Sequence, residues 1–558
     1  MTPLKKHLAC SSDFVRPADR DLSSSVVASV RGSSDGRGST KPLQVSVPRP
    51  IGRSPEAIAR TARFSSTTFP HGRQSRRRIR KPIHVLKFGG TSVGEVSAIL
   101  KTIEVIQTAT TTGSVVVVVS AMSGVTNKLL EAARCSEVGD RSAVSSILEA
   151  LRNQHAVTVN ALVDSAEERG KLVNRIAVLL EECDQFCRGT TLLRELTPRA
   201  RDAISSLGER LIAPVLSAAL RERGLSSRFI EASDLLVTNS NHGAAEPLME
   251  PTAERCQAAL LPLLRQGVVP VVTGFIGATE SGVLTTLGRG GSDYSATILG
   301  AALEADEVSI WTDVDGVLTA DPRLVPDATT VPEISYHEAA ELAYFGAKVL
   351  HPKTLRPLMR AGIPVWIRNT FSPHGVGTKI TPDGSSRTQG VKALTAISDV
   401  VLITVGGPGI VGSTDVLSRT FRITAAVQAD VLLVSQSSSQ NDICFVVPSW
   451  CAKKAVEALR REFAQDSEGE KVEHINVDTN VAIVAAVGQN MRGMPGIAGR
   501  TFGVLGQESV NVMAIAQGSS KCNISFLLAA NDMRTALLAI HREFRLGTVG
   551  GTASAAVC

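Results

Sequence analysis

The sequence predicts an α/β fold: an open, mostly parallel sheet covered by helices on both faces, followed by two smaller α/β domains. Three observations support this prediction. From Ile83 onward, short apolar segments alternate with longer segments in which apolar residues recur at helical spacing. Polar, glycine-rich loops follow the apolar segments. A pattern in the last third of the chain occurs twice.

The first predicted strand leads into the sequence VLKFGGTSVG, residues 85–94. Two glycines and two hydroxyl side chains follow the apolar residues, and apolar positions in residues 96–106 then recur at helical spacing. A strand, a glycine-rich turn and a helix N-terminus together form a cradle for an anion. Lys87 precedes the glycines, so the order is neither that of a P-loop nor that of a dinucleotide fingerprint. Lys87 is therefore a candidate phosphate ligand, with a purely structural place at the strand end as the alternative.

The next elements continue the alternation. Five valines, Val115–Val119, predict a strand that is buried on both faces. A small, hydroxylated loop over residues 120–127 follows, and then a long helical region to about residue 223. Further strands are expected over Val268–Thr273 and Glu307–Trp311. Because ligands of such sheets bind at the carboxyl ends of the strands, we expect four polar loops to meet at one edge.

These loops supply candidates for binding. Taken singly, GRGGSD (residues 288–293) could be a turn into a helix capped by its aspartate, TDVDG (residues 312–316) a plain turn, and Glu209 a residue on a solvated helix face. Taken together, the polar side chains suit a polyphosphate beside a zwitterion, and no Ser-His-Asp or Cys-His arrangement competes as a nucleophile. The loop candidates are Lys87, Ser92, Ser120, Thr126, Arg289, Ser292, Asp293 and Asp313.

Charge divides the chain into a tail and a body. Residues 1–82 hold 17 Lys and Arg against 5 Asp and Glu, so the net charge of +6 leaves a mildly acidic body. This balance argues against a nucleic-acid partner, and the lack of an apolar run of roughly 20 residues argues against a membrane. The Ser- and Arg-rich tail is predicted to be disordered. We expect a cytoplasmic protein, with the plastid stroma as the alternative if the tail is a transit peptide.

The nine cysteines are scattered along the chain, and only Cys183 and Cys187 lie close together. Their spacing suits one face of a helix, but no second pair and no histidines follow at zinc spacing. We therefore expect thiols in a reducing compartment and no metal site.

The repeat appears when the sequence is shifted on itself by 81 residues, which places Ala429–Val447 over Val510–Leu528 without a gap. Each copy reads as strand, helix, strand, strand, helix and strand, and tandem copies of this kind pack together. The expected bounds are 1–82 for the tail, 83–381 for the sheet domain, 382–396 for a linker, and 397–475 and 478–550 for the two copies.

Six motifs resemble, in order and spacing, those of aspartate kinases, which have the amino-acid kinase fold. They are KFGGTSVG, SAMSGVTN, LGERL, LGRGGSDYSA, WTDVDGVLTADPR and ELAYFGAKVLHP. The resemblance covers about residues 83–550, and the repeat is similar to that family's two ferredoxin-like ACT domains. It implies that ATP with Mg²⁺ phosphorylates the side-chain carboxylate of L-aspartate, giving 4-phospho-L-aspartate, the first step toward lysine, threonine and methionine. Because that carboxylate is ionised at neutral pH, the reaction needs charge neutralisation and in-line positioning rather than a general base.

The resemblance also assigns residues. It gives the catalytic positions to Lys87, Arg289 and Asp293, with Asp293 organising Lys87 and the metal. The ATP positions are Lys87, Phe88, Gly89, Gly90, Thr312, Asp313, Leu318, Arg323, Lys348 and Val349. The aspartate positions are Ser92, Ser120, Thr126, Glu209, Arg289 and Ser292. Leu318 departs from the tyrosine that many relatives have near the adenine.

Regulation is expected at the repeat, where Gln436 and Gln517 occupy equivalent places. An amide both donates and accepts hydrogen bonds, which suits a bound amino acid, while a strand-turn cap is the alternative role. The resemblance is to threonine-sensitive aspartate kinases, in which matching glutamines help to bind the inhibitor. Lysine is the alternative effector, and a homodimer or homotetramer through the ACT domains is expected.

The sequence as printed stops at Cys558, without the roughly 300 residues of the homoserine dehydrogenase domain that some relatives carry. We therefore expect a monofunctional kinase. A catalytically silent amino-acid sensor, built from ACT domains on a kinase scaffold, is the alternative function. It would be favoured by loss of the loop residues, and the six motifs retain theirs.

Overall fold

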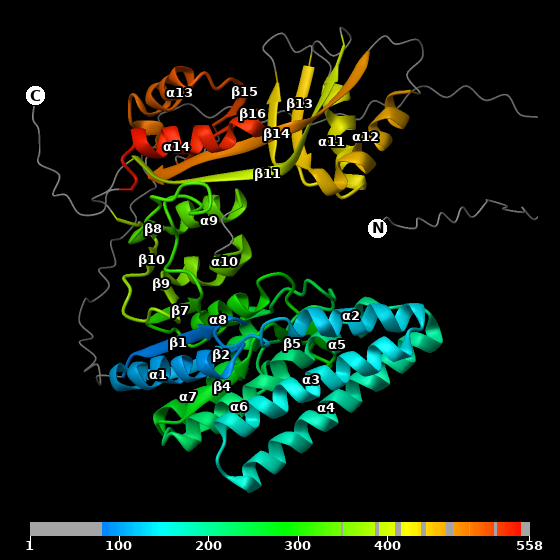
Figure 1. The fold of residues 1–558 in the computed structure, drawn as a ribbon, viewed down its shortest axis with the longest axis vertical. Coiled ribbons are helices and arrows are strands. Elements are labelled where there is room, and N and C mark those ends of the chain that lie inside the picture. The colour runs from blue at the N-terminus through cyan, green and yellow to red at the C-terminus, as the bar shows by residue number, and fades with distance from the viewer. Residues whose placement is uncertain are drawn as a thin grey trace, which may run out of the picture. The chain divides into compact units, whose positions relative to one another are not determined.

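The computed structural model describes residues 81–346, 350–385, 390–407, 414–436, 442–464, 472–489, 491–517 and 522–547 (Figure 1). The tail predicted over residues 1–82 lies outside these ranges except for its last two residues, and so do Lys348 and Val349. Three sheets organise the described residues: one of eight strands, one of six, and a two-stranded pair.

The eight-stranded sheet has the order β3-β4-β2-β1-β7-β9-β10-β8. Its strands are β1 (Ile83–Phe88), β2 (Ser114–Val119), β3 (Ser227–Ile230), β4 (Val269–Thr273), β7 (Glu307–Thr312), β8 (Glu333–Ser335), β9 (Val365–Asn369) and β10 (Thr378–Thr381). Strands β9 and β10 pair antiparallel, and all other pairs between these strands are parallel. The prediction of an open, mostly parallel sheet is confirmed.

Helices cover both faces of this sheet, as predicted. The helices are α1 (Val96–Thr112), α2 (Val125–Val138), α3 (Arg141–Leu162), α4 (Ala166–Leu193), α5 (Pro198–Ser205), α6 (Leu207–Glu222), α7 (Met249–Arg265), α8 (Gly291–Ala302), α9 (Tyr336–Tyr344) and α10 (Pro352–Ala361). Val116 and Val118 of β2 enter a core shared with α7, α8 and α10, whereas Val115, Val117 and Val119 enter a core shared with α1 to α6. The unbroken valine run therefore serves two cores, one on each face.

The long helical region consists of α2 to α6, and the fully buried Ile204 and Leu207 belong to its apolar stripe. Within the described part of the chain, one segment, Pro198–Glu222, is apolar and long enough to span a membrane by length and composition, contrary to our expectation of none. The structure buries 89% of its most apolar window, which is the environment of a core helix.

A short antiparallel pair, β5 (Ile276–Ala278) and β6 (Leu284–Thr286), stands apart from the large sheet. The GRGGSD loop follows β6, so three of the four polar loops, not all four, follow strands of the large sheet. The helix after this loop begins at Gly291 with Gly290 as its cap, so Asp293 lies within the first turn, and the alternative in which it caps the helix is wrong.

The six-stranded sheet has the order β12-β13-β11-β14-β16-β15 and is antiparallel. Its elements are β11 (Gly390–Gly406), α11 (Thr414–Ala426), β12 (Leu433–Gln436), β13 (Asp442–Pro448), α12 (Ser449–Phe463), β14 (His474–Gln489), α13 (Ile497–Gln507), β15 (Val512–Ala516), β16 (Asn523–Ala529) and α14 (Met533–Glu543). Adding 81 to the bounds of β13 gives those of β16. The two copies therefore have equivalent strands, as the repeat predicted.

Strand β11 begins inside the segment that we expected as a linker, residues 382–396. Its first half pairs with the second half of β14, with Leu394 opposite Ala486, and its second half pairs with β13. Residues 390–396 are thus strand rather than linker, because they lie beside β14 where the second copy needs a further strand.

Candidate active site

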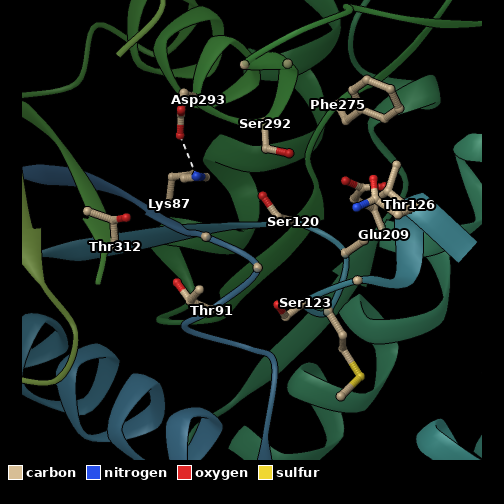
Figure 2. Close-up of a pocket in the computed structure, with 18 of the residues that line it drawn as sticks. Lys87, Thr91, Ser120, Ser123, Thr126, Glu209, Phe275, Ser292, Asp293 and Thr312 are labelled. Carbon is tan, nitrogen blue, oxygen red and sulfur yellow. Dashed lines mark ion pairs between the residues drawn. The ribbon is translucent and has the colours of Figure 1, made fainter. Parts of the chain in front are cut away.

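A cavity of about 500 Å³ lies at the carboxyl ends of β1, β2 and β7. All four polar loops that we expected to meet contribute to its wall, together with Glu209 and Phe275. Figure 2 shows Lys87 and Thr312 toward one end of the cavity and Glu209 and Thr126 toward the other. We call the end at Lys87 the lysine end and the end at Glu209 the carboxylate end.

At the lysine end, Lys87 is paired with a carboxylate. Its side chain is 9% exposed, and its Nζ lies 2.5 Å from Asp293 Oδ1, an ion pair drawn in Figure 2. The turn after it is held by the neighbouring strand, because the backbone nitrogen of Gly89 donates to the carbonyl of Trp311 at 3.0 Å. A Cβ at Gly90 would lie 3.0 Å from the carbonyl oxygen of Ala121, so a larger residue would crowd the loop after β2.

Glu209 lies at the carboxylate end, so the alternative of a solvated helix face is wrong. It lies in the first turn of α6, and its side chain is 3% exposed. Burial raises the pKa of its carboxyl to about 8, against hydrogen bonds from the Ala121 backbone and the Ser292 side chain. Its Oε2 has no hydrogen-bond partner among the described residues. The reason for the error is that α6 is buried nearly all round, so an apolar stripe does not identify an exposed face.

The N-terminus of α8 is seated against β4 by a glycine. A Cβ at Gly274 would lie 2.7 Å from the Cβ of Ser292 and 2.9 Å from the carbonyl oxygen of Val119, closer than such atoms approach. Gly290, with φ of 70°, makes the left-handed turn into the helix. These two glycines allow Ser292 and Asp293 to reach the cavity from the first turn of α8.

The structure gathers most of the predicted residues at this cavity. Those in its wall are Lys87, Gly89, Gly90, Ser120, Thr126, Glu209, Ser292, Asp293, Thr312 and Asp313. Five described residues that we predicted are not in its wall: Phe88, Ser92, Arg289, Leu318 and Arg323. Lys348 and Val349 lie outside the described residues.

Two of these five residues support the site from behind. Phe88 is fully buried and its ring stacks on Trp311, with ring centroids 6.2 Å apart. Ser92 is also fully buried, and its hydroxyl lies 2.7 Å from the hydroxyl of Thr370. Both side chains therefore fix the glycine-rich turn and do not face the cavity.

The other three lie elsewhere. Arg289 is in the wall of a neighbouring cavity of about 690 Å³, which shares Gly290 and Asp293 with the first. Leu318 forms an isolated backbone bridge with Thr330. Arg323 is exposed and pairs with Asp321.

Sequence reasoning missed several residues in the wall, among them Thr91, Ser123 and Phe275. Thr91 and Ser123 belong to the polar loops, so their hydroxyls were visible in the sequence. Phe275 gave a weaker signal, because the sequence shows only that it follows Gly274 at the end of a predicted strand. In the structure its backbone has a φ of 68°, which is uncommon for a residue with a side chain.

The cavity offers oxygen ligands for a hard cation. Asp293 and Asp313 both contribute to its wall. Among the described residues, no group of three His, Cys, Asp or Glu side chains is placed to hold a metal ion alone. Mg²⁺ commonly uses one or two carboxylates together with substrate phosphates, and this donor set fits that pattern.

Comparison with known proteins places the chain in a family. Residues 82–369 match the amino acid kinase family, and residues 403–463 and 484–544 match the ACT domain. Bifunctional aspartokinase/homoserine dehydrogenase 2 of Arabidopsis thaliana, a chloroplastic protein, is 36% identical over 83% of this chain and 50% of its own length. The chain thus spans about half the length of the curated relatives that it matches first. Aspartokinase 1 of the same plant, also chloroplastic, is 32% identical over 82% of this chain and 80% of its own length.

Solved structures agree with these relatives. E. coli aspartokinase III in complex with aspartate and ADP (R-state) is 31% identical, with a TM-score of 0.70, and the match covers 83% of this chain and all of that chain. The same enzyme with lysine and aspartate (T-state) gives a TM-score of 0.68 at 31% identity, over 82% of this chain and 99% of that chain. The chain therefore belongs to the amino acid kinase family and, with its two ACT domains, to the aspartokinases.

Proposed function

We propose that this chain transfers the terminal phosphoryl group of ATP, with Mg²⁺, to the side-chain carboxylate of L-aspartate. One observation carries the proposal: the buried Glu209, with an oxygen that has no partner in the described part of the chain, shares a cavity with Lys87 and the glycine-rich turn. A buried carboxylate without a partner favours a cationic ligand, and a phosphate favours the lysine end. An amino acid, through its ammonium group, would pair with Glu209, and a polyphosphate would pair with Lys87.

The carboxylate end suits the amino acid. The ammonium group of L-aspartate would pair with Glu209 and return its pKa toward the ordinary range. Ser120, Thr126 and Ser292 add hydroxyl donors beside it. The α-carboxylate needs a cationic or polar donor. Arg289 keeps that role as a proposal, because it directly precedes Gly290, which lines both cavities, although Arg289 itself lines only the neighbouring one.

The lysine end suits the polyphosphate. Lys87 would neutralise charge on the transferring group, and the Gly89-Gly90 backbone would approach it closely because neither residue has a side chain. Thr312 and Asp313 lie beside this end after β7. Asp293 and Asp313 would hold Mg²⁺, which would supply positive charge to neutralise the phosphate groups.

The transfer itself needs little from the protein beyond placement. A side-chain carboxylate oxygen of aspartate forms a bond to the terminal phosphorus, the bond from that phosphorus to the bridging oxygen breaks, and ADP leaves. The nucleophile is already an anion, so no proton has to be removed. Lys87 counters the repulsion between the two anions, which is the main barrier to their approach.

A coupled assay of ADP release tests this proposal. L-aspartate, L-glutamate and N-acetylglutamate are compared at equal concentration with the full chain. We expect release with L-aspartate well above the other two, because N-acetylglutamate has no ammonium for Glu209. Release with none of the three would support the silent amino-acid sensor instead.

We also propose that an end-product amino acid regulates the chain through the ACT domains. The lysine bound in the T-state structure of E. coli aspartokinase III supports an amino-acid effector of this kind. Threonine at Gln436 and Gln517 stays our first candidate and lysine the alternative. Assembly through the ACT domains is a further proposal, and light scattering of the full chain would measure its size.

The cellular location is open to a similar test. The chloroplastic location of the Arabidopsis relatives supports the plastid stroma, whereas the cytoplasm was our first expectation. A fluorescent protein fused after residues 1–82 would enter plastids in plant cells if this basic segment is a transit peptide. Fluorescence spread through the cytosol would reject that role.

A further inference from the structure

Asp202 is a buried carboxylate that the proposed reaction does not use. It lies on α5, it is 1% exposed, and it is not in the wall of the active-site cavity. Its Oδ2 lies 2.8 Å from His242 Nδ1 and accepts hydrogen bonds from the backbone nitrogens of Gly243 at 3.0 Å and Thr286 at 3.2 Å. Its Oδ1 accepts the hydroxyl of Thr286 at 2.6 Å. A buried carboxylate is costly unless its oxygens are satisfied in this way.

These contacts join the two segments that build the aspartate end of the site. On one side, α5 leads directly into α6, whose first turn carries Glu209. On the other side, Thr286 ends β6 and precedes the loop that delivers Ser292 in the first turn of α8. The Asp202 side chain therefore links the segment that leads into α6 to the segment that leads into α8.

The loop that follows β6 is held from a second direction as well. The backbone nitrogen of Ala245 donates to the carbonyl of Thr286 at 3.0 Å. A Cβ at Gly288 would lie only 2.7 Å from the carbonyl oxygen of Gly243, so the loop and residues 242–245 are in close contact. Asp202 holds both of them, because it accepts from Gly243 and from Thr286.

We propose that Asp202 is a positioning residue for the amino-acid substrate: it fixes the separation between Glu209 and Ser292. This inference rests on the proposed kinase function. Ser292 and Glu209 line the same cavity, so a shift of the loop would disturb the ammonium site. The polyphosphate end shares Asp293 with α8, but Lys87, Thr312 and Asp313 come to it from the ends of β1 and β7. Loosening Asp202 should therefore weaken aspartate binding more than ATP binding.

The test variant is Thr286→Val in the full chain, which keeps the shape of the side chain and removes the hydrogen bond to Asp202 Oδ1. We expect the KM for L-aspartate to rise by about tenfold, the scale of one hydrogen bond to a charged group, with the KM for ATP within about twofold. Thr286→Ser keeps the hydroxyl and should restore the KM for L-aspartate. A purely structural role would lower the melting temperature and the active fraction but leave that KM unchanged.

The matched control is Thr252→Val. Thr252 is also fully buried, and its hydroxyl also holds backbone, accepting from the nitrogen of Val237 at 3.0 Å and donating to its carbonyl at 3.2 Å. It should lower stability without raising the KM for L-aspartate. His242→Ala removes a partner of Asp202 from a partly exposed position and serves if Thr286→Val does not fold. It should raise the same KM by about threefold.

The outcomes separate this inference from the function on which it rests. An unchanged KM for L-aspartate in folded Thr286→Val and His242→Ala would overturn the positioning role, while wild-type activity stays intact. Equal rises in the KM for L-aspartate and for ATP, or the same rise in Thr252→Val, would also overturn it. Absence of activity in the wild type would instead reject the proposed kinase.

Discussion

At the scale of single residues, the active-site cavity depends on two charges that face different ligands. Lys87 is paired with Asp293 and sits at the end of β1, while Glu209 is buried with an unpartnered oxygen. Each is costly to bury, and each is matched by one end of the proposed substrate pair. The two residues can therefore be tested separately, Lys87 by its effect on turnover and Glu209 by its effect on stability.

Lys87→Ala should lower turnover by about two to four orders of magnitude, the scale lost when one well-placed stabilising charge is removed. Steady-state ADP release measures this loss, and thermal unfolding checks that the fold persists. Lys171→Ala is a matched control, since it removes a lysine from an exposed ion pair with Glu167 on α4. A fall of less than roughly threefold in folded Lys87→Ala would show that Lys87 is not a phosphate ligand.

Glu209→Gln should change how stability depends on pH. The folded protein holds the Glu209 proton up to about pH 8, whereas the unfolded chain releases it near the ordinary carboxyl pKa, so stability falls as the pH rises between these values. A neutral amide removes this dependence. Relative to wild type, the variant should gain stability at pH 8.5 compared with pH 5, on the order of 1 to 3 kcal/mol. Thermal melts without ligand measure the gain, and parallel curves for both proteins would contradict it.

At the scale of elements, the sequence pattern predicted those strands and helices whose formation depends mainly on neighbouring residues in the chain. The five valines of β2, the helix after the glycine-rich turn and the equivalence of β13 with β16 all follow from periodicity. Contacts between distant segments were not readable in the same way. The first half of β11 became strand because β14 lies beside it, and Glu209 is buried because α6 is surrounded by other helices.

The same distinction applies to the residues of the candidate site: some were predicted from the sequence, and others depend on contacts between distant segments. The residues of the polar loops were found because glycine, hydroxyl and charge are visible in the sequence. The loops also had to meet, which the parallel sheet predicts for those after β1, β2 and β7. Ser92 bonds to Thr370 behind the cavity, and Arg289 lines the neighbouring cavity. Both placements depend on side-chain packing, which the spacing of residues in the sequence does not show. Asp202 was missed because its partners come from two distant segments, residues 242–243 and Thr286.

The contact between β4 and α8 gives a prediction at this scale. Gly274→Ala places a methyl group 2.7 Å from the Cβ of Ser292 and 2.9 Å from the Val119 carbonyl, so α8 has to move away from the strand. We expect turnover to fall at least tenfold, because Ser292 and Lys87's partner Asp293 move with the helix. Gly189→Ala on α4 is the control, since no atom of the described residues lies within 4 Å of its added methyl and its φ is not positive. Equal activity in the two variants would contradict the claim that close packing at Gly274 fixes the position of α8.

At the scale of the whole molecule, α9 connects the kinase part with the six-stranded sheet. Lys392 of β11 forms a buried ion pair with Glu338, at 3.0 Å, and Asn523 of β16 donates to Glu341 at 2.6 Å. Glu338 also closes the capping box of α9 with Ser335. A change in the sheet would therefore reach α9, which ends just before Lys348, one of the predicted ATP residues.

Effector binding gives the prediction at this scale. Gln436 ends β12 and Gln517 follows β15, both exposed, at positions that the 81-residue shift makes equivalent. Gln436→Ala or Gln517→Ala should weaken inhibition by about 5- to 150-fold, a coupling of roughly 1 to 3 kcal/mol, with uninhibited turnover within about twofold. Inhibition curves with threonine, lysine and both together measure it, with Gln507→Ala on α13 as control. Unchanged curves in both variants would reject the glutamine sites, and inhibition by lysine alone would replace threonine as the effector.

The most direct test of the central claim is the product itself. An acyl phosphate reacts with hydroxylamine to give a hydroxamate, so the full chain with MgATP, L-aspartate and hydroxylamine should form aspartyl hydroxamate in step with ADP. We expect the yield to depend on L-aspartate and to fall in Lys87→Ala as turnover does. ADP release without hydroxamate, or more hydroxamate from N-acetylglutamate than from L-aspartate, would contradict an aspartate kinase.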